Sequence, residues 1–118
     1  MKNQSLYKAI SRFNKFEIEA LFSISKKTSY SSFWDFRFAK TTDHVGRILI
    51  IASKKIGSAP ERNKIKRQIK SIFYEEKLYG LGYTFICIVK KPLIQKKFEF
   101  IKKNMVEVIH NEIINKAF

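Results

Sequence analysis

The sequence predicts a single α+β domain of the α/β sandwich class. A chain of 118 residues is long enough for one domain with its own core and too short for two ordinary ones. Hydrophobic residues make up 45% of the chain and aromatic residues 14%, a composition that excludes a disordered basic tail. Segments of helical and of strand period follow in the order helix, strand, strand, helix, strand, helix.

The first expected helix covers residues 14–25. One face carries residues at spacings of three and four: Phe13, Glu17, Ala20, Leu21 and Ile24. At 100° per residue, Ile18 and Phe22 fall on the opposite face. If the first set packs on the core, we expect Ile18 and Phe22 to look outward or into a groove, as binding residues or as a second packing contact.

Two strands are expected next, over residues 33–39 and 47–52. In the first, Trp34, Phe36 and Phe38 alternate with Asp35 and Arg37, which is typical of a strand with one wetter face. The second is an almost continuous apolar run, typical of a strand covered on both sides. Residues 41–46 have the composition of a turn, so a hairpin is the simplest pairing of these two strands.

The second expected helix covers residues 60–77 and separates two kinds of side chain. Pro60 suits its first position, where the missing N–H removes no hydrogen bond. One stripe at helical spacing is apolar: Ile65, Ile69, Ile72 and Phe73. The far side and its flanks are polar and mostly cationic: Arg62, Asn63, Lys64, Lys66, Arg67 and Lys70. The helix therefore has one face for the core and one basic face.

A buried strand over residues 83–89 and an amphipathic helix over residues 95–115 complete the pattern. Residues 53–56 leave room for one further short strand. The strand, helix, strand unit over residues 47–89 predicts two parallel strands if they share a sheet, joined by a right-handed crossover under the general rule.

Positive charge is concentrated in one part of the chain. The formal net charge is +14, and seven of the seventeen residues from Lys54 to Lys70 are Lys or Arg, with Glu61 as the one acid. Such a density at a turn and the first turns of a helix suits phosphate groups. The expected partner is a polyanion, and nucleic acid is the leading candidate.

The sequence contains few of the residue patterns that catalysis by protein side chains requires. It contains neither a GxxxxGK loop nor a GxGxxG fingerprint, and we expect His44 and His110 to be surface residues. Asp35 and Asp43 could meet across a hairpin, which is weak support for a metal site. Cys87 lies in an apolar run and is expected to be a buried core residue. With no apolar stretch near 18 residues long, we expect a cytoplasmic binding module that does not enter a membrane.

Residues 53–67, here called the signature segment, resemble the signature of the bacterial ribonuclease P protein family. The family pattern is a Ser-Lys-Lys-x-Gly turn followed by an Arg-Asn-Arg-x-Lys-Arg helix. This sequence matches it at Ser53, Lys54, Lys55, Gly57, Arg62, Asn63, Lys66 and Arg67. It departs from the pattern at Lys64 and Lys70, where the family usually has Arg; Lys keeps the charge and loses the bidentate fork.

The resemblance implies a fold, a function and two sets of binding residues. It implies an α/β sandwich whose strand, helix, strand crossover is left-handed. It implies binding of the catalytic RNA through Ser53, Lys54, Lys55, Arg62, Asn63, Lys64, Lys66, Arg67 and Lys70. It also implies that the single-stranded 5′ leader of precursor tRNA binds in a cleft that contains Ile18, Phe22 and Phe36.

In that family the RNA subunit, with Mg²⁺ held mainly by RNA, carries out the cleavage. The resemblance therefore implies no catalytic and no metal-binding residue in the protein, and one protein per ribonuclease P RNA. Two other functions stay open from the residues alone. One is a structural RNA-binding protein of the ribosomal type, and the other is a dimeric DNA-binding protein whose basic helix enters a major groove.

Overall fold

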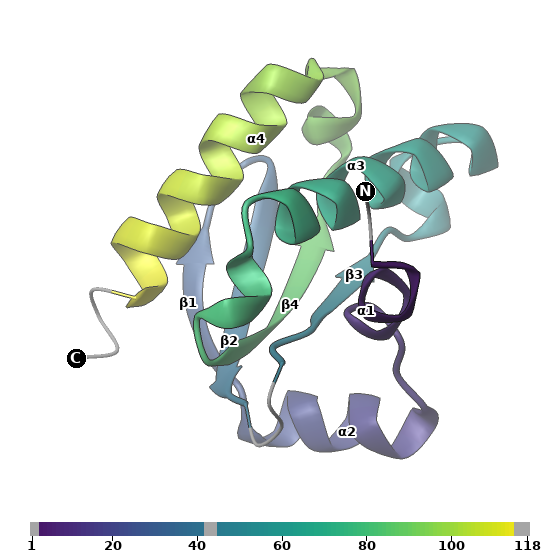
Figure 1. Cartoon of the computed structure of the whole chain (residues 1–118). Coiled ribbons are helices and arrows are strands. Elements are labelled where there is room, and N and C mark those ends of the chain that lie inside the picture. Colours follow the sequence, from purple (N-terminus) through teal and green to yellow (C-terminus); the bar gives the residue numbers. More distant parts are fainter. Residues whose placement is uncertain (1–2, 42–44, 115–118) are drawn as a thin grey trace.

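The computed structural model describes residues 3–41 and 45–114 (Figure 1). Its helices are α1 (Gln4–Ala9), α2 (Lys15–Ile24), α3 (Ala59–Glu75) and α4 (Phe98–Glu107), and α4 continues as a π-helix, Val108–Ile114. Its strands are β1 (Lys26–Tyr30), β2 (Trp34–Lys40), β3 (Ile48–Ile51) and β4 (Tyr83–Val89). Short 3₁₀ turns cover Lys54–Ile56, Leu78–Gly80 and Lys91–Gln95.

The four strands form one sheet in the order β1-β2-β4-β3. β2 pairs antiparallel with both β1 and β4, and β3 pairs parallel with β4. The parallel pairing of residues 47–52 with residues 83–89 is therefore confirmed. The expected hairpin between β2 and β3 is wrong, because β4 lies between these two strands. The left-handed crossover stays a prediction.

Helices α2 and α3 both begin with a capping box. Asn14 Oδ1 accepts from Glu17 N at 2.8 Å, and Glu17 Oε1 accepts from Asn14 N at 3.0 Å. Ser58 and Glu61 repeat this arrangement at the start of α3. Each reciprocal pair satisfies two backbone N–H groups that the first turn would otherwise leave without a partner. The starts of both helices thus follow from their local sequence.

The main core lies between one face of the sheet and helices α3 and α4. The predicted stripe of α3 is buried there: Ile65, Ile69, Ile72 and Phe73. The sheet contributes Trp34, Phe36, Phe85 and Cys87, and α4 contributes Ile101 and Met105. Trp34 Nε1 also donates to Asn104 Oδ1 at 2.9 Å, so its one polar atom is satisfied.

Helix α2 lies on the opposite face of the sheet, where a smaller cluster joins Leu21, Ala39 and Ile86. The sheet is therefore the middle layer of three, with α2 on one side and α3 and α4 on the other (Figure 1). This arrangement confirms the predicted sandwich class.

Helix α1 packs beside α3 and at the free edge of β3. The rings of Tyr7 and Tyr74 meet edge to face at 5.4 Å, and Asn3 N donates to Tyr74 Oη at 2.6 Å. Just after the helix, Ile10 is fully buried and its carbonyl accepts from Ile48 N at 2.7 Å. The N-terminal segment thus covers the start of an edge strand.

Several element boundaries differ from the expected ones. Residues 54–56 form a 3₁₀ turn and not a strand, and the final helix begins at Phe98 after the turn Lys91–Gln95. Neither α1 nor β1 was expected. No helix within residues 3–41 and 45–114 is long and apolar enough to cross a membrane.

Candidate RNA interface

The signature segment follows β3 directly and forms a turn that leads into α3. Most of its predicted RNA-binding side chains are exposed: Ser53, Lys54, Lys55, Asn63, Lys64 and Arg67. Arg62 and Lys66 are half-buried, as is Lys70, the predicted RNA-binding residue that follows the segment on α3. The opposite stripe of α3 is buried in the core, so the helix holds these cations at fixed positions on one side.

The turn is shaped by the capping box of α3. Glu61 Oε1 accepts from Ser58 N at 2.8 Å, which brings the carboxylate against Gly57. A Cβ atom at Gly57 would lie 2.9 Å from that same oxygen, so only glycine leaves enough space for the Glu61 carboxylate here. The hydrogen bonds from Ser58 lower the pKa of Glu61. Glu61, the one acidic residue of the signature segment, is thus hydrogen-bonded within the N-terminal cap of α3.

Two of the cations, Lys70 and Arg62, lie against the protein and not in open solvent. Lys70 Nζ lies 4.2 Å from the centre of the Tyr7 ring, which joins α1 to the basic face of α3. Arg62 Nε is buried and makes no hydrogen bond to any described residue. Its guanidinium is therefore held close to the protein surface, whereas Arg67 extends into solvent.

Helix α2 divides the other face of the sheet into two halves. Leu21 and Ser25 are buried and point at the sheet. At 100° per residue, Glu17 and Ile24 lie to one side of this pair, the Glu17 flank. Ile18 and Phe22 lie to the other side, the Phe22 flank.

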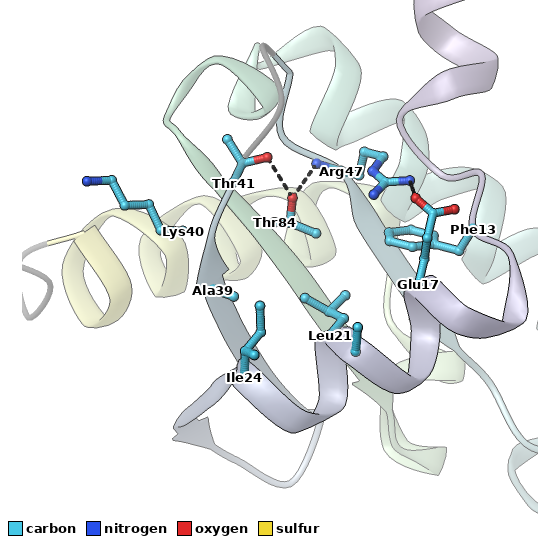
Figure 2. Close-up of a pocket in the computed structure, with 10 residues that line it drawn as sticks. Phe13, Glu17, Leu21, Ile24, Ala39, Lys40, Thr41, Arg47 and Thr84 are labelled. Carbon is cyan, nitrogen blue, oxygen red and sulfur yellow. Dashed lines mark hydrogen bonds and ion pairs between the residues drawn. The ribbon is translucent and has the colours of Figure 1, made fainter.

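The Glu17 flank borders a cleft of about 350 Å³ between α2 and the sheet (Figure 2). Arg47 Nη1 lies 2.7 Å from Glu17 Oε2, and its guanidinium stacks on the Phe13 ring with 4.5 Å to the centroid. The backbone hydrogen bond at Asn14 and the ion pair with Arg47 lower the pKa of Glu17. The residues expected to pack α2 on the core line this cleft instead, and only Leu21 among them is buried.

The Phe22 flank of α2 lies against β2, where Arg37 contacts it. Phe22 is 37% exposed and Ile18 is half-buried. Arg37 ties this flank to β2: its Nη2 donates to the carbonyls of Phe22 at 3.3 Å and Ser25 at 3.0 Å, and its Nε donates to Ser25 Oγ at 2.9 Å. The guanidinium lies 5.8 Å from the centre of the Phe22 ring. One side of this aromatic ring is therefore held by a cation.

A row of paired residues crosses the sheet beyond Arg37. Asp35 pairs with Ile88, and Ile88 pairs with Ile51, so the three share one face of the sheet. Ile51 and Ile88 are only partly buried. Ser53, the first residue of the signature segment, follows Ile51 by two positions. The Phe22 flank and the signature segment therefore lie at the same end of the parallel strands.

Phe36 does not belong to this face. Its side chain is fully buried in the main core, with its ring 5.0 Å from that of Trp34. The expectation that Phe36 contacts the leader is wrong, because its alternation with Asp35 and Arg37 turns it toward α3 and α4. The same alternation could have identified Asp35 and Arg37 as the residues of β2 on the α2 side.

The sequence also singled out Asp35, Asp43, His44, Cys87 and His110. Cys87 is fully buried, and this burial raises the pKa of its thiol. His110 is exposed, while Asp43 and His44 lie outside the described residues. Asp35 forms an ion pair with Lys90 at 3.0 Å. Within residues 3–41 and 45–114, no group of three or more His, Cys, Asp or Glu side chains could hold a metal ion.

Known proteins resemble this chain in sequence and in fold. The family model for ribonuclease P matches residues 11–112. The ribonuclease P protein component of Bacillus cereus is 33% identical over 93 residues, which cover 78% of this chain and 81% of that protein. That of Streptococcus agalactiae is 29% identical over 93 residues, covering 79% and 84%.

Two solved structures share the fold. The RNase P protein of Staphylococcus aureus has a TM-score of 0.74 at 22% identity, covering 86% of this chain and 93% of that one. The RNase P protein from Thermotoga maritima has a TM-score of 0.71 at 22% identity, covering 83% and 93%. The sequence match extends over most of the chain and includes both α2 and the signature segment. This chain therefore belongs to the ribonuclease P protein family.

Proposed function

We propose that this protein binds ribonuclease P RNA through the signature segment and α3, and holds the 5′ leader of precursor tRNA along the Phe22 flank of α2. Family membership makes the chain part of ribonuclease P, an endoribonuclease complex with an RNA partner. In the proposed division of labour the RNA and its Mg²⁺ ions supply the chemistry. The protein positions the substrate, with one protein for each RNA.

The observation that carries the RNA-binding part is the split of α3 into a buried stripe and a cationic side. Ile65 and Ile69 anchor the helix in the core, while Arg67 and its cationic neighbours face outward. Several Lys and Arg side chains on one helix can contact several phosphates of an RNA strand at once. Burial of the stripe lets the helix present this charge without rearranging.

Support for the leader path comes from its position. The Phe22 ring is partly exposed, and the half-buried Ile51 and Ile88 continue the surface toward Ser53. A single strand that leaves the RNA bound at α3 could follow this surface and stack a base on Phe22, which is how unpaired nucleotides usually bind proteins. Ile18 would add apolar contact without stacking.

The net charge of +14 gives the protein a second task in this proposal. Catalytic RNA and precursor tRNA are both polyanions and repel each other. A basic protein between them screens this repulsion and reduces the Mg²⁺ concentration that the complex requires.

The test is a cleavage assay with a bacterial ribonuclease P RNA and a precursor tRNA that carries a leader, at low Mg²⁺. Addition of the protein should increase the rate of 5′ leader removal. Duplex DNA of equal length serves as the competitor. No gain in cleavage, or stronger binding to the duplex DNA than to the RNA, would overturn the proposal.

A further inference from the structure

Asp35 is an acidic side chain on the surface proposed for the leader. It lies on β2 between the core residues Trp34 and Phe36, so it points to the α2 side of the sheet. Arg37 follows on the same face, about 7 Å along the strand. The chain has only 10 acidic residues against 24 basic ones, and this acid is placed next to Ile88 on the proposed path.

Lys90 fixes the orientation of the Asp35 carboxylate. Lys90 Nζ lies 3.0 Å from Asp35 Oδ1 and 2.7 Å from the carbonyl oxygen of Ser31, which accepts its hydrogen bond. Oδ1 is buried, while the Asp35 side chain as a whole keeps 17% exposure. The Lys90 ammonium therefore contacts Oδ1, the buried carboxylate oxygen. The exposed part of the side chain lies among its other atoms, which include Oδ2.

A carboxylate at this place suits a nucleobase better than a phosphate. It would repel a phosphate, whereas an ionised oxygen accepts a strong hydrogen bond from an amino group on a base edge. Lys90 offsets the charge, so a polyanion can approach. Adenine, cytosine and guanine each carry an exocyclic amine. Uracil has none, and its ring N3–H lies between two carbonyl oxygens that a carboxylate would repel.

We propose that Asp35 is a specificity-determining residue that accepts a hydrogen bond from the exocyclic amine of one leader base and disfavours uracil there. This inference rests on the proposed function, because it assumes that the leader crosses the Phe22 flank. In this arrangement Arg37 and Phe22 contact one part of the RNA leader, and Asp35 hydrogen-bonds to the base of the next nucleotide. A site that offers an acceptor rejects a base that lacks the matching donor.

The test measures the affinity of the reconstituted holoenzyme for a panel of precursor tRNAs. Each has an all-uridine leader with a single A, C or G at one position. The wild type should favour the amine-bearing bases at one position by roughly tenfold, the size of one hydrogen bond to a charged group. Asp35→Asn has the same shape, and with its Oδ1 kept toward Lys90 it carries an NH₂ donor in place of the second carboxylate oxygen. This variant should lose most of the preference for amine-bearing bases, because an NH₂ group can donate to a carbonyl oxygen of uracil as well as to acceptors on the other bases.

Two further variants separate base reading from structure. Asp35→Ala removes both acceptor and donor and should give a flat base profile. Glu99→Gln makes the same charge change at an exposed position on α4 and should keep the wild-type profile. A melting curve for each variant shows that it is folded.

The outcomes distinguish this inference from the proposed function. If leader-bearing and leaderless substrates bind equally, the leader path itself is overturned, and Asp35 with it. If the leader adds affinity but Asp35→Asn has the base profile of the wild type, only the role of Asp35 is overturned.

Discussion

The clearest test of the basic helix is Arg67→Gln, which removes one exposed charge from α3. Arg67 extends from the side of the helix opposite Ile65 and Ile69, so this change leaves the buried stripe intact. Glutamine has a high helix propensity, and the helix itself should keep its stability. The expected effect is therefore confined to the electrostatic part of RNA binding.

The magnitude follows from counterion release. Each phosphate contact contributes roughly 0.7 to 0.9 to the slope of log affinity against log salt. Between about 50 and 200 mM salt, a fourfold change, one contact accounts for about a threefold change in affinity. Arg67→Gln should bind the RNA more weakly than the wild type at low salt. Between about 50 and 200 mM salt, its affinity should fall by a factor about threefold smaller than the factor for the wild type.

The assay is a filter-binding or fluorescence titration of ribonuclease P RNA at five or more salt concentrations. Lys103→Gln is the matched control, because Lys103 is exposed on α4, away from the signature segment. It changes the net charge by the same amount. An unchanged slope for Arg67→Gln, or an equal change for Lys103→Gln, would show that overall charge and not this helix face binds the RNA.

Three other predictions concern α2, the core and the cap of α3. Phe22→Ala should weaken binding of leader-bearing precursor by about 1 to 3 kcal/mol and spare leaderless tRNA, whereas Phe16→Ala, at an 82% exposed ring on the outer side of α2, should affect neither. Phe36→Ala should lower the free energy of unfolding by about 3 to 5 kcal/mol in a urea titration; a leader-specific affinity loss with normal stability would contradict the burial of Phe36. Because the pKa of Glu61 is lowered below its ordinary value of 4.5 in the folded state, its contribution is present above pH 4.5 and is lost as pH falls through the folded pKa. The stability difference between wild type and Glu61→Gln should therefore shrink below pH 4.5, and a difference that grows there would refute the cap.

The helices that carry the proposed contacts were predictable because their signals are local. Pro60 and the apolar stripe identified α3, and its burial matches the stripe residue for residue. The two missed elements lack such signals. α1 is six residues long, and β1 begins with Lys26 and Lys27, which suit an exposed edge strand and show no apolar alternation.

The pairing of strands was not predictable in the same way, because it depends on contacts between distant residues. Adjacent strands in sequence often pair, which favoured a β2–β3 hairpin, but β4 takes the position between them. Phe36 shows a related difficulty. Its alternation with Asp35 and Arg37 was visible, yet which face of β2 met the larger core depended on where α3 and α4 packed.

The central position of β4 also determines the order in which the domain can assemble. β4 is the last strand to leave the ribosome, and both β2 and β3 require it as a partner. Until residues 83–89 are available, β3 lacks its partner strand and the main core lacks Phe85 and Cys87. Such non-local pairing slows folding and leaves intermediates open to aggregation. A nascent chain that ends before β4 would thus contain the complete basic helix without the sheet that holds it in place.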